Sequence, residues 1–139
     1  MDRIRIGVIG LGFGQYLVRT LAHLEGAQLV LVAYGTAARV AQSAVKRLRD
    51  EGLPVGLFRP ISLWPFPIKQ MLPMLEGARG IVVVEAGSGQ LEDEMRLAFS
   101  HADVHAPPTI SSVQHYGGVL PQEQEIVEKG TALAEGSSE

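Results

Sequence analysis

The residues best suited to chemistry are the glycines of an early turn, Gly10, Gly12 and Gly14. Glycines at this spacing allow backbone amides to approach a phosphate closely, as in dinucleotide-binding turns. Gly14 comes one residue before the third glycine of that pattern, and Gln15 occupies the usual place. The next strand should end in an acid for the cofactor ribose, but Tyr34 is found there. The turn therefore has two interpretations, a nucleotide site or a plain connection between strand and helix.

A second group of polar residues and glycines falls where the predicted strands end. Its members are Gly35, Thr36, Arg59, Glu85, Gly89 and Gln90. A parallel sheet brings the carboxyl ends of its strands to one edge, so this group is expected to meet a ligand or partner there. Arg59 is expected to hold an anion or an acidic neighbour, and the purely structural alternative is pairing with Glu85. The glycines have a structural alternative too, as turn residues only.

Trp64 and Phe66 lie in a run of alternating prolines and aromatic residues, LWPFP. Side chains fixed in this way are expected to form a stiff aromatic surface that docks another subunit. The structural alternative is that Trp64 caps the hydrophobic core.

Composition disfavours several kinds of chemistry. The chain has 139 residues and no cysteine, which excludes disulfides, cysteine-ligated iron–sulfur clusters and thiol catalysis within it. The histidines show no zinc-site spacing, so no metal is expected; they are His23, His101, His105 and His115. A net charge of -3 predicts no nucleic-acid partner. No apolar run approaches the length of a membrane span, and a cytoplasmic protein with no membrane partner is expected.

Apolar periodicity predicts the elements that position these residues. Strands are expected over 5–9, 29–33, 55–58 and 80–85, with one or two weaker strands at 104 and 109–113. Helices are expected over 15–24, 37–50 with Thr36 as N-cap, 91–99 and 123–129, with a short helix from 68 towards 75. The alternation predicts an α/β fold, a three-layer α/β/α sandwich around a mostly parallel, Rossmann-like sheet of five to six strands. Residues 1–130 are expected to form one domain and 131–139 a flexible tail.

Residues 1–33, with the turn GVIGLGFGQ, resemble the first strand and helix of NAD(P)-binding proteins of the glucose–fructose oxidoreductase type. That resemblance implies a dinucleotide-type segment and a small NAD(P)-binding module as one functional alternative. The catalytic lysine of that family, in an EKP-like motif, has no counterpart here.

A second resemblance covers residues 29–130. It is carried by LVLVAYGTAARVAQSAV, GLFRPISLWPFP, IVVVEAGSGQLEDEMRLA and GGVLPQEQEIVE. In this order they resemble the C-terminal, transketolase-C-like domain of the α subunit of 2-oxoacid:ferredoxin oxidoreductases, with RPxxLWPFP the most specific piece.

The second resemblance implies a non-catalytic domain or small subunit of a complex that decarboxylates a 2-oxoacid oxidatively to an acyl-CoA. The implied partners are the other subunits. Thiamine diphosphate, iron–sulfur clusters and CoA would belong to the whole complex, and this chain would bind no cofactor. A stand-alone partner-binding domain is the third alternative.

Overall fold

The computed structural model describes residues 6–9 and 27–136 of the chain. Its strands are β1 (Ile6–Ile9), β2 (Leu29–Ala33), β3 (Val55–Pro60), β4 (Gly80–Glu85) and β5 (Thr109–Gln114). They form one sheet in the order β1-β3-β2-β4-β5, and every neighbouring pair is parallel. The prediction of a parallel sheet with five to six strands is therefore confirmed with five.

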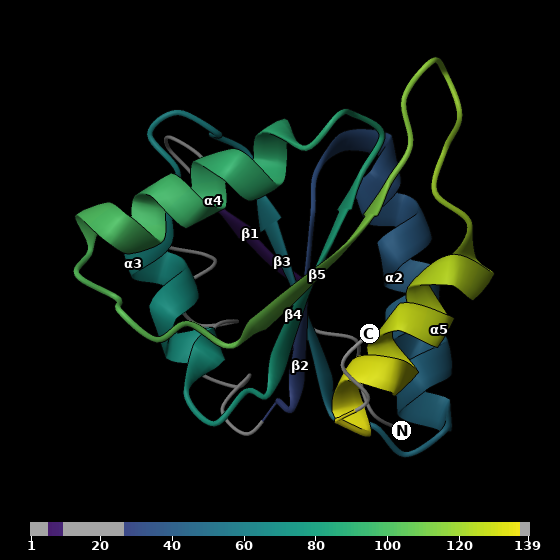
Figure 1. Ribbon diagram of the computed structural model, residues 1–139. Coiled ribbons are helices and arrows are strands. Elements are labelled where there is room, and N and C mark those ends of the chain that lie inside the picture. Colours follow the sequence, from purple (N-terminus) through teal and green to yellow (C-terminus); the bar gives the residue numbers. More distant parts are fainter. Residues whose placement is uncertain (1–5, 10–26, 137–139) are drawn as a thin grey trace.

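Helices cover both faces of this sheet (Figure 1). One face carries α2 (Gly35–Asp50) and α5 (Glu123–Ala134), which pack against each other. The other carries α3 (Ile68–Met71), the 3-10 turn η1 (Leu72–Leu75) and α4 (Gln90–His101). The predicted three-layer α/β/α arrangement is confirmed.

The sequences of the central strands explain why helices cover both faces of the sheet. All of β2 and β4 is buried, and both read as continuous apolar runs, as strands covered on both faces do. Successive side chains point to opposite faces, so Leu29 and Leu31 enter the core under α2 and α5. Val30 and Val32 enter the core under α3 and α4. Two hydrophobic cores thus share one sheet.

Helix α2 begins slightly earlier than its sequence predicts. Its N-cap is Tyr34, whose backbone is extended, and Gly35 starts the helix with φ of +58°. Thr36 therefore lies in the first turn and is not the cap. No described side chain caps this end, and no acid lies in the first turn of the helix, so its early amides have no side-chain partner among the residues that the structure describes.

Helix α5 is longer than predicted and includes the first residues of the expected flexible tail. It extends to Ala134, which is buried, so residues 131–134 are the last turn of a helix and not a flexible tail. The physical reason is a buried stripe at helical spacing that continues past Lys129 through Gly130 to Ala134. Gly130 lies against Leu48 of α2, where an added Cβ would be 3.1 Å from Leu48 Cδ1. The small residue lets the two helices approach closely.

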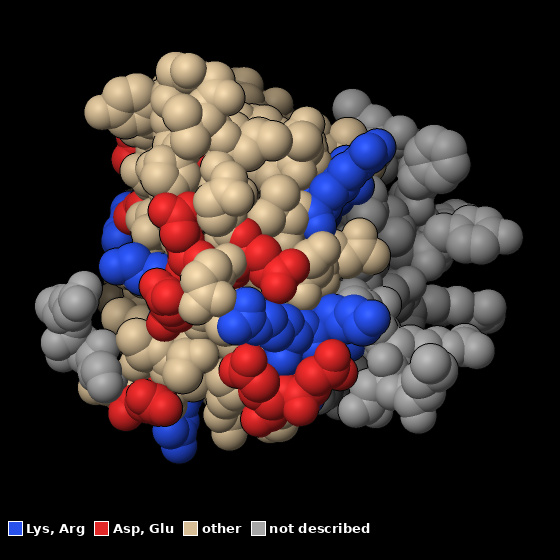
Figure 2. Space-filling view, turned by 90° about the vertical axis from the view of Figure 1, so that its right-hand side faces the viewer, with Lys and Arg blue, Asp and Glu red and all other residues tan. Residues whose placement is uncertain are grey.

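Acidic and basic side chains are interleaved over the α2 and α5 face of the molecule (Figure 2). Arg47 of α2 pairs with Glu51 at 3.4 Å and with Glu123 of α5 at 3.7 Å. Mixed signs at this density do not form the basic patch that nucleic acid requires. Within residues 6–9 and 27–136, no helix has the length and apolar character needed to cross a bilayer.

Candidate functional site

The order of the strands creates a switch point between β2 and β4. The chain runs from β2 to β3 on one side and then returns to β4 on the other. In open parallel sheets, ligands bind at such a point, beyond the carboxyl ends of the strands. Ala33 is paired with Val84, so the next residues, Tyr34 and Glu85, are neighbours in the register. The structure thus brings Gly35 and Thr36 to the same edge as the loop after β4.

Glu85 is the chemically unusual residue at this point. It ends β4 and is fully buried. Its Oε2 accepts the backbone N–H of Leu91, in the first turn of α4, at 3.1 Å. Its Oε1 is buried and has no hydrogen-bond partner among the described residues. A buried acceptor without a donor is uncommon and costs about 1–3 kcal/mol, so Glu85 has a hydrogen-bonding capacity that the described residues leave unmet.

Glycines shape the loop between Glu85 and α4. A Cβ on Gly87 would lie 2.5 Å from Glu85 Oε1 and 3.0 Å from Gln90 Oε1, so a side chain there must displace the buried carboxylate. Gly89, the N-cap of α4, has φ of +107°, which other residues rarely adopt. Gln90 is tied locally, since its side chain donates to Ser88 Oγ at 2.8 Å and accepts the Ser88 N–H at 3.0 Å. These residues hold the loop in one conformation.

Arg59 lies near the end of β3, on the same edge and paired in register with Val8 of β1. Within the described residues it makes no ion pair with Glu85. The structural alternative of an Arg59–Glu85 pair is therefore wrong, because Glu85 turns inward to the start of α4 instead.

A second carboxylate, Glu92, fastens α4 to the edge strand. It accepts hydrogen bonds from Ser112 Oγ, from Gln114 Nε2 at 3.0 Å and from Arg96 Nε at 2.8 Å. Burial by itself raises the pKa of Glu92, but the bonds from Ser112, Arg96 and Gln114 outweigh it and hold the pKa below its ordinary value. Glu92 is thus ionised at neutral pH and orders the outer strand.

The loop between β5 and α5 is held by a further pair. His115 Nε2 lies 2.9 Å from each carboxylate oxygen of Glu125, which also accepts the Gln122 N–H at 2.8 Å. The Gln122 backbone bond and then the His115 bond lower the pKa of Glu125. The pair closes the start of α5, a structural role.

Trp64 and Phe66, expected to form one exposed aromatic surface, differ in exposure. Trp64 is 71% exposed, whereas Phe66 is 6% exposed and packs on Phe58, with ring centroids 6.0 Å apart. Phe66 is therefore a core residue. The chain turns between the prolines so that the two aromatic side chains take opposite environments.

Trp64 also lies away from the switch point. It borders a groove of about 240 Å³ on the outer side of α4, lined by Phe66, Ile68, Leu97, Ala98 and His101. Glu94 lines the same groove, and its Oε2 is buried with no hydrogen-bond partner within residues 6–9 and 27–136. The expected single rim therefore divides into two places: a buried edge at Glu85 and an exposed groove at Trp64.

The glycines of the early turn, Gly10, Gly12 and Gly14, lie outside the described residues. The described part of the chain brings no three histidine or acidic side chains together in a way that could hold a metal. The sequence did not identify Glu92, Glu94 or Gln114 as site residues. Glu92 and Gln114 are joined by a hydrogen bond between α4 and β5, and the burial of Glu94 Oε2 depends on the residues that surround α4 in the fold. Neither feature can be read from a short segment of sequence. A carboxylate in the first turn of α4 was the available signal for Glu92.

The fold and the site together define a three-layer α/β domain with a glycine-rich loop at its switch point. The chain belongs to the family described as pyruvate:ferredoxin oxidoreductase core domain II, which matches residues 27–126. This match runs from the residues before β2 into the first turns of α5. The resemblance of residues 29–130 to a 2-oxoacid:ferredoxin oxidoreductase domain is confirmed at the level of the family.

Individual relatives agree with the family. The chain is 37% identical over 127 residues to ketoisovalerate oxidoreductase subunit VorB of Methanothermobacter thermautotrophicus, covering 91% of this chain and 33% of the relative. It is 32% identical over 106 residues to 2-oxoglutarate synthase subunit KorA of Methanothermobacter marburgensis, covering 76% and 27%.

One solved structure is similar in fold, with a TM-score of 0.62 and 25% identity. It is 2-oxoglutarate:ferredoxin oxidoreductase from Magnetococcus marinus with 2-oxoglutarate, coenzyme A and succinyl-CoA bound. The similarity covers 78% of this chain and 18% of that chain. The chain thus spans about a third of the length of the curated relatives it matches, and less of this structure.

Proposed function

We propose that this chain is a non-catalytic domain or small subunit of a thiamine-diphosphate-dependent 2-oxoacid:ferredoxin oxidoreductase. The complex would decarboxylate a 2-oxoacid oxidatively to an acyl-CoA and pass electrons to ferredoxin. The observation that carries the proposal is the family match over residues 27–126, which contains β2 to β5 and both helix layers. The role of this chain would be to pack against the parts that hold the cofactors.

The residues present support a packing role. With no cysteine the chain cannot ligate an iron–sulfur cluster. The described residues bring no carboxylate cluster together for the metal of a bound diphosphate. Thiamine diphosphate and the clusters would therefore be held by other parts of the complex. No reaction step is assigned to the side chains of this domain.

The groove beside Trp64 is the surface proposed for docking. Trp64 and Leu97 are exposed at its margin, 71% and 41% respectively. Exposed aromatic side chains next to a pocket are frequent anchors of protein interfaces. Glu94 Oε2 is buried beside the same groove, has no hydrogen-bond partner in the described part of the chain, and would accept a donor from the docked subunit.

Co-expression with the thiamine-binding subunit of a 2-oxoacid:ferredoxin oxidoreductase tests this proposal. The chain is expected to co-purify with that subunit, and the complex to reduce a viologen dye in the presence of a 2-oxoacid and CoA. Trp64→Ser should weaken co-purification at least tenfold, since interface aromatic anchors are worth about 2 kcal/mol or more. Tyr116→Ser is the matched control, because Tyr116 is 73% exposed but lies on the loop after β5. Co-purification that survives Trp64→Ser would refute docking at this groove.

A small NAD(P)-binding module is the second candidate, from the resemblance of residues 1–33. In dinucleotide folds the strand before the glycine turn is central and borders the switch point. Here β1 is at the outer edge of the sheet, beside β3, which favours the first candidate. Titration of NADH, followed through the single tryptophan, distinguishes the two. Saturable binding that Gly12→Val abolishes would replace the first candidate with the second.

A further inference from the structure

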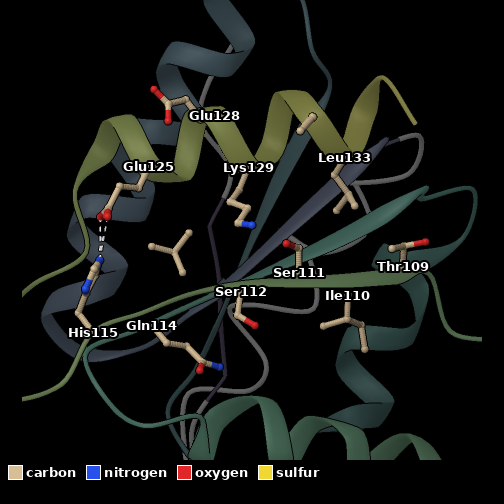
Figure 3. Close-up of a pocket in the computed structure, with 12 residues that line it drawn as sticks. Thr109, Ile110, Ser111, Ser112, Gln114, His115, Glu125, Glu128, Lys129 and Leu133 are labelled. Atoms are coloured by element: carbon tan, nitrogen blue, oxygen red, sulfur yellow. Dashed lines mark hydrogen bonds and ion pairs between the residues drawn. The ribbon is translucent and has the colours of Figure 1, made fainter. Parts of the chain in front are cut away.

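Among the described residues, no strand pairs with the outer edge of β5. Strand β5 is last in the order of the described strands, and β4 is the one described strand with which it pairs. In Figure 1 this edge faces the viewer between the helix layers, and Figure 3 shows α5 beside it. The strand reads TISSVQ, with neither the charges nor the proline that commonly protect an edge. Its backbone is thus a ready template for another strand.

The hydrogen bonds inside the sheet identify which groups face outward. The N–H of His115 donates to the carbonyl of Glu85 on β4 at 3.2 Å. Backbone groups alternate in direction along a strand, so those of Ser111 and Val113 also point to β4. The N–H and C=O of Ile110, Ser112 and Gln114 therefore point away from the sheet.

We propose that a second copy of this chain pairs with this edge, antiparallel, about a two-fold axis normal to the sheet at Ser112. Such an axis places Ser112 opposite itself and Ile110 opposite Gln114 of the second copy. The outward N–H and C=O groups of these three residues then form doubly hydrogen-bonded pairs with the same groups of the second copy. Pro108 would be the next outward-facing residue and has no N–H, so the ladder ends where the strand ends. The axis also keeps each helix layer on its own side of the continuous sheet.

The surroundings of β5 fit this occupant. A groove of about 630 Å³ lies between β5 and α5, beside this edge (Figure 3). Small side chains at the centre, Ser111 and Ser112, allow a close approach of the two copies. Glu128 and Lys129 of α5 also line this groove.

The edge is also prepared for pairing. Glu92 already holds the side chains of Ser112 and Gln114 on the α4 side. Little conformational entropy is therefore lost when a second strand adds to it. This self-association is independent of the Trp64 groove, which lies on the outer side of α4.

Sedimentation equilibrium of the full chain over a wide concentration range tests the proposal, with a dimer as the expected result. Ser112→Pro should weaken dimerisation roughly tenfold or more, because it removes an outward N–H at the axis. Ser112→Ala is the matched control, since it loses the same hydroxyl but keeps the N–H, and should still dimerise. A wild-type chain that stays monomeric throughout, or a Ser112→Pro variant that dimerises as well as wild type, would overturn the proposal.

Amide hydrogen exchange on the wild-type chain keeps the proposal testable if Ser112→Pro does not fold. The amides of Ile110, Ser112 and Gln114 should become protected as concentration rises. Those of Ser111 and Val113 should be protected at every concentration, because they bond to β4. A dimer in which the first three amides exchange freely would use another surface and refute the edge pairing.

Discussion

Replacing Glu85 by glutamine should stabilise the domain. Glu85 is fully buried; its Oε2 accepts the Leu91 N–H, and its Oε1 has no donor among the described residues. Glutamine has the same shape and keeps an oxygen for Leu91. Its amide group would take the place of Oε1 beside Gly87, and Gln90 Oε1 borders the same space, since a Cβ on Gly87 would lie 2.5 Å from Glu85 Oε1 and 3.0 Å from Gln90 Oε1. The substitution therefore puts a donor in the place of the unpaired acceptor, with another acceptor bordering the same space.

The magnitude follows from the cost of an unpaired buried acceptor. Removing it should raise the free energy of unfolding by about 1–2 kcal/mol. For a chain of 139 residues this corresponds to roughly 3–5 °C in Tm per kcal/mol. Glu85→Ala should have the opposite effect, a loss of about 2–4 kcal/mol, because it removes the acceptor for Leu91 and leaves a cavity.

Urea denaturation of the two variants and wild type measures both effects. Glu76→Gln is the control, since Glu76 is exposed and its substitution should change stability by less than about 0.5 kcal/mol. The slope of free energy against urea should stay the same in all four proteins. If Glu85→Gln destabilised the domain as much as Glu85→Ala, Oε1 would be serving a favourable interaction and the reasoning would be refuted.

Three further predictions concern stability. Gly89→Ala should cost about 1–2 kcal/mol in urea denaturation, because φ of +107° at the start of α4 strains any other residue; an unchanged midpoint would contradict it. Glu92 has a lowered pKa in the folded state, so its contribution is present above its unfolded pKa and is lost as pH falls below about 4.5. The difference between the urea midpoints at neutral and at acid pH should therefore be smaller in Glu92→Gln than in wild type. An equal difference in both proteins would contradict a stabilising role of the ionised Glu92. Phe66→Ala should cost about 3–5 kcal/mol and Trp64→Ala less than about 0.5 kcal/mol in thermal unfolding, and equal losses would show that the two environments are wrongly assigned.

The regular elements were predictable because their signals are local. β4 has the predicted bounds, and β2 also matches, since continuous apolar runs bounded by glycines and polar residues indicate buried strands. Helix α2 was predictable from apolar residues at helical spacing. The end of α5 was missed because its last turn is stabilised by packing on the core, although Ala134 itself continues the spacing.

The candidate site was predictable only in outline. The prediction that a parallel sheet brings the carboxyl ends of β2, β3 and β4 to one edge is confirmed. Exposure was not predictable: Trp64 and Phe66 belong to the same short motif, yet one is exposed and the other buried. Which side chain turns inward depends on Phe58 and the α4 face, which lie elsewhere in the chain.

The sequence by itself determined the class of fold and the family, because buried-strand patterns, helix periodicity and the LWPFP motif are properties of short segments. Only the tertiary structure decided that β1 lies beside β3 at the edge of the described sheet, that one oxygen of Glu85 has no donor in the described part of the chain, and that Glu92 accepts a hydrogen bond from Ser112. Each of these depends on contacts between residues far apart in the chain, whose pairing is selected by the packing of the whole sheet and its helices.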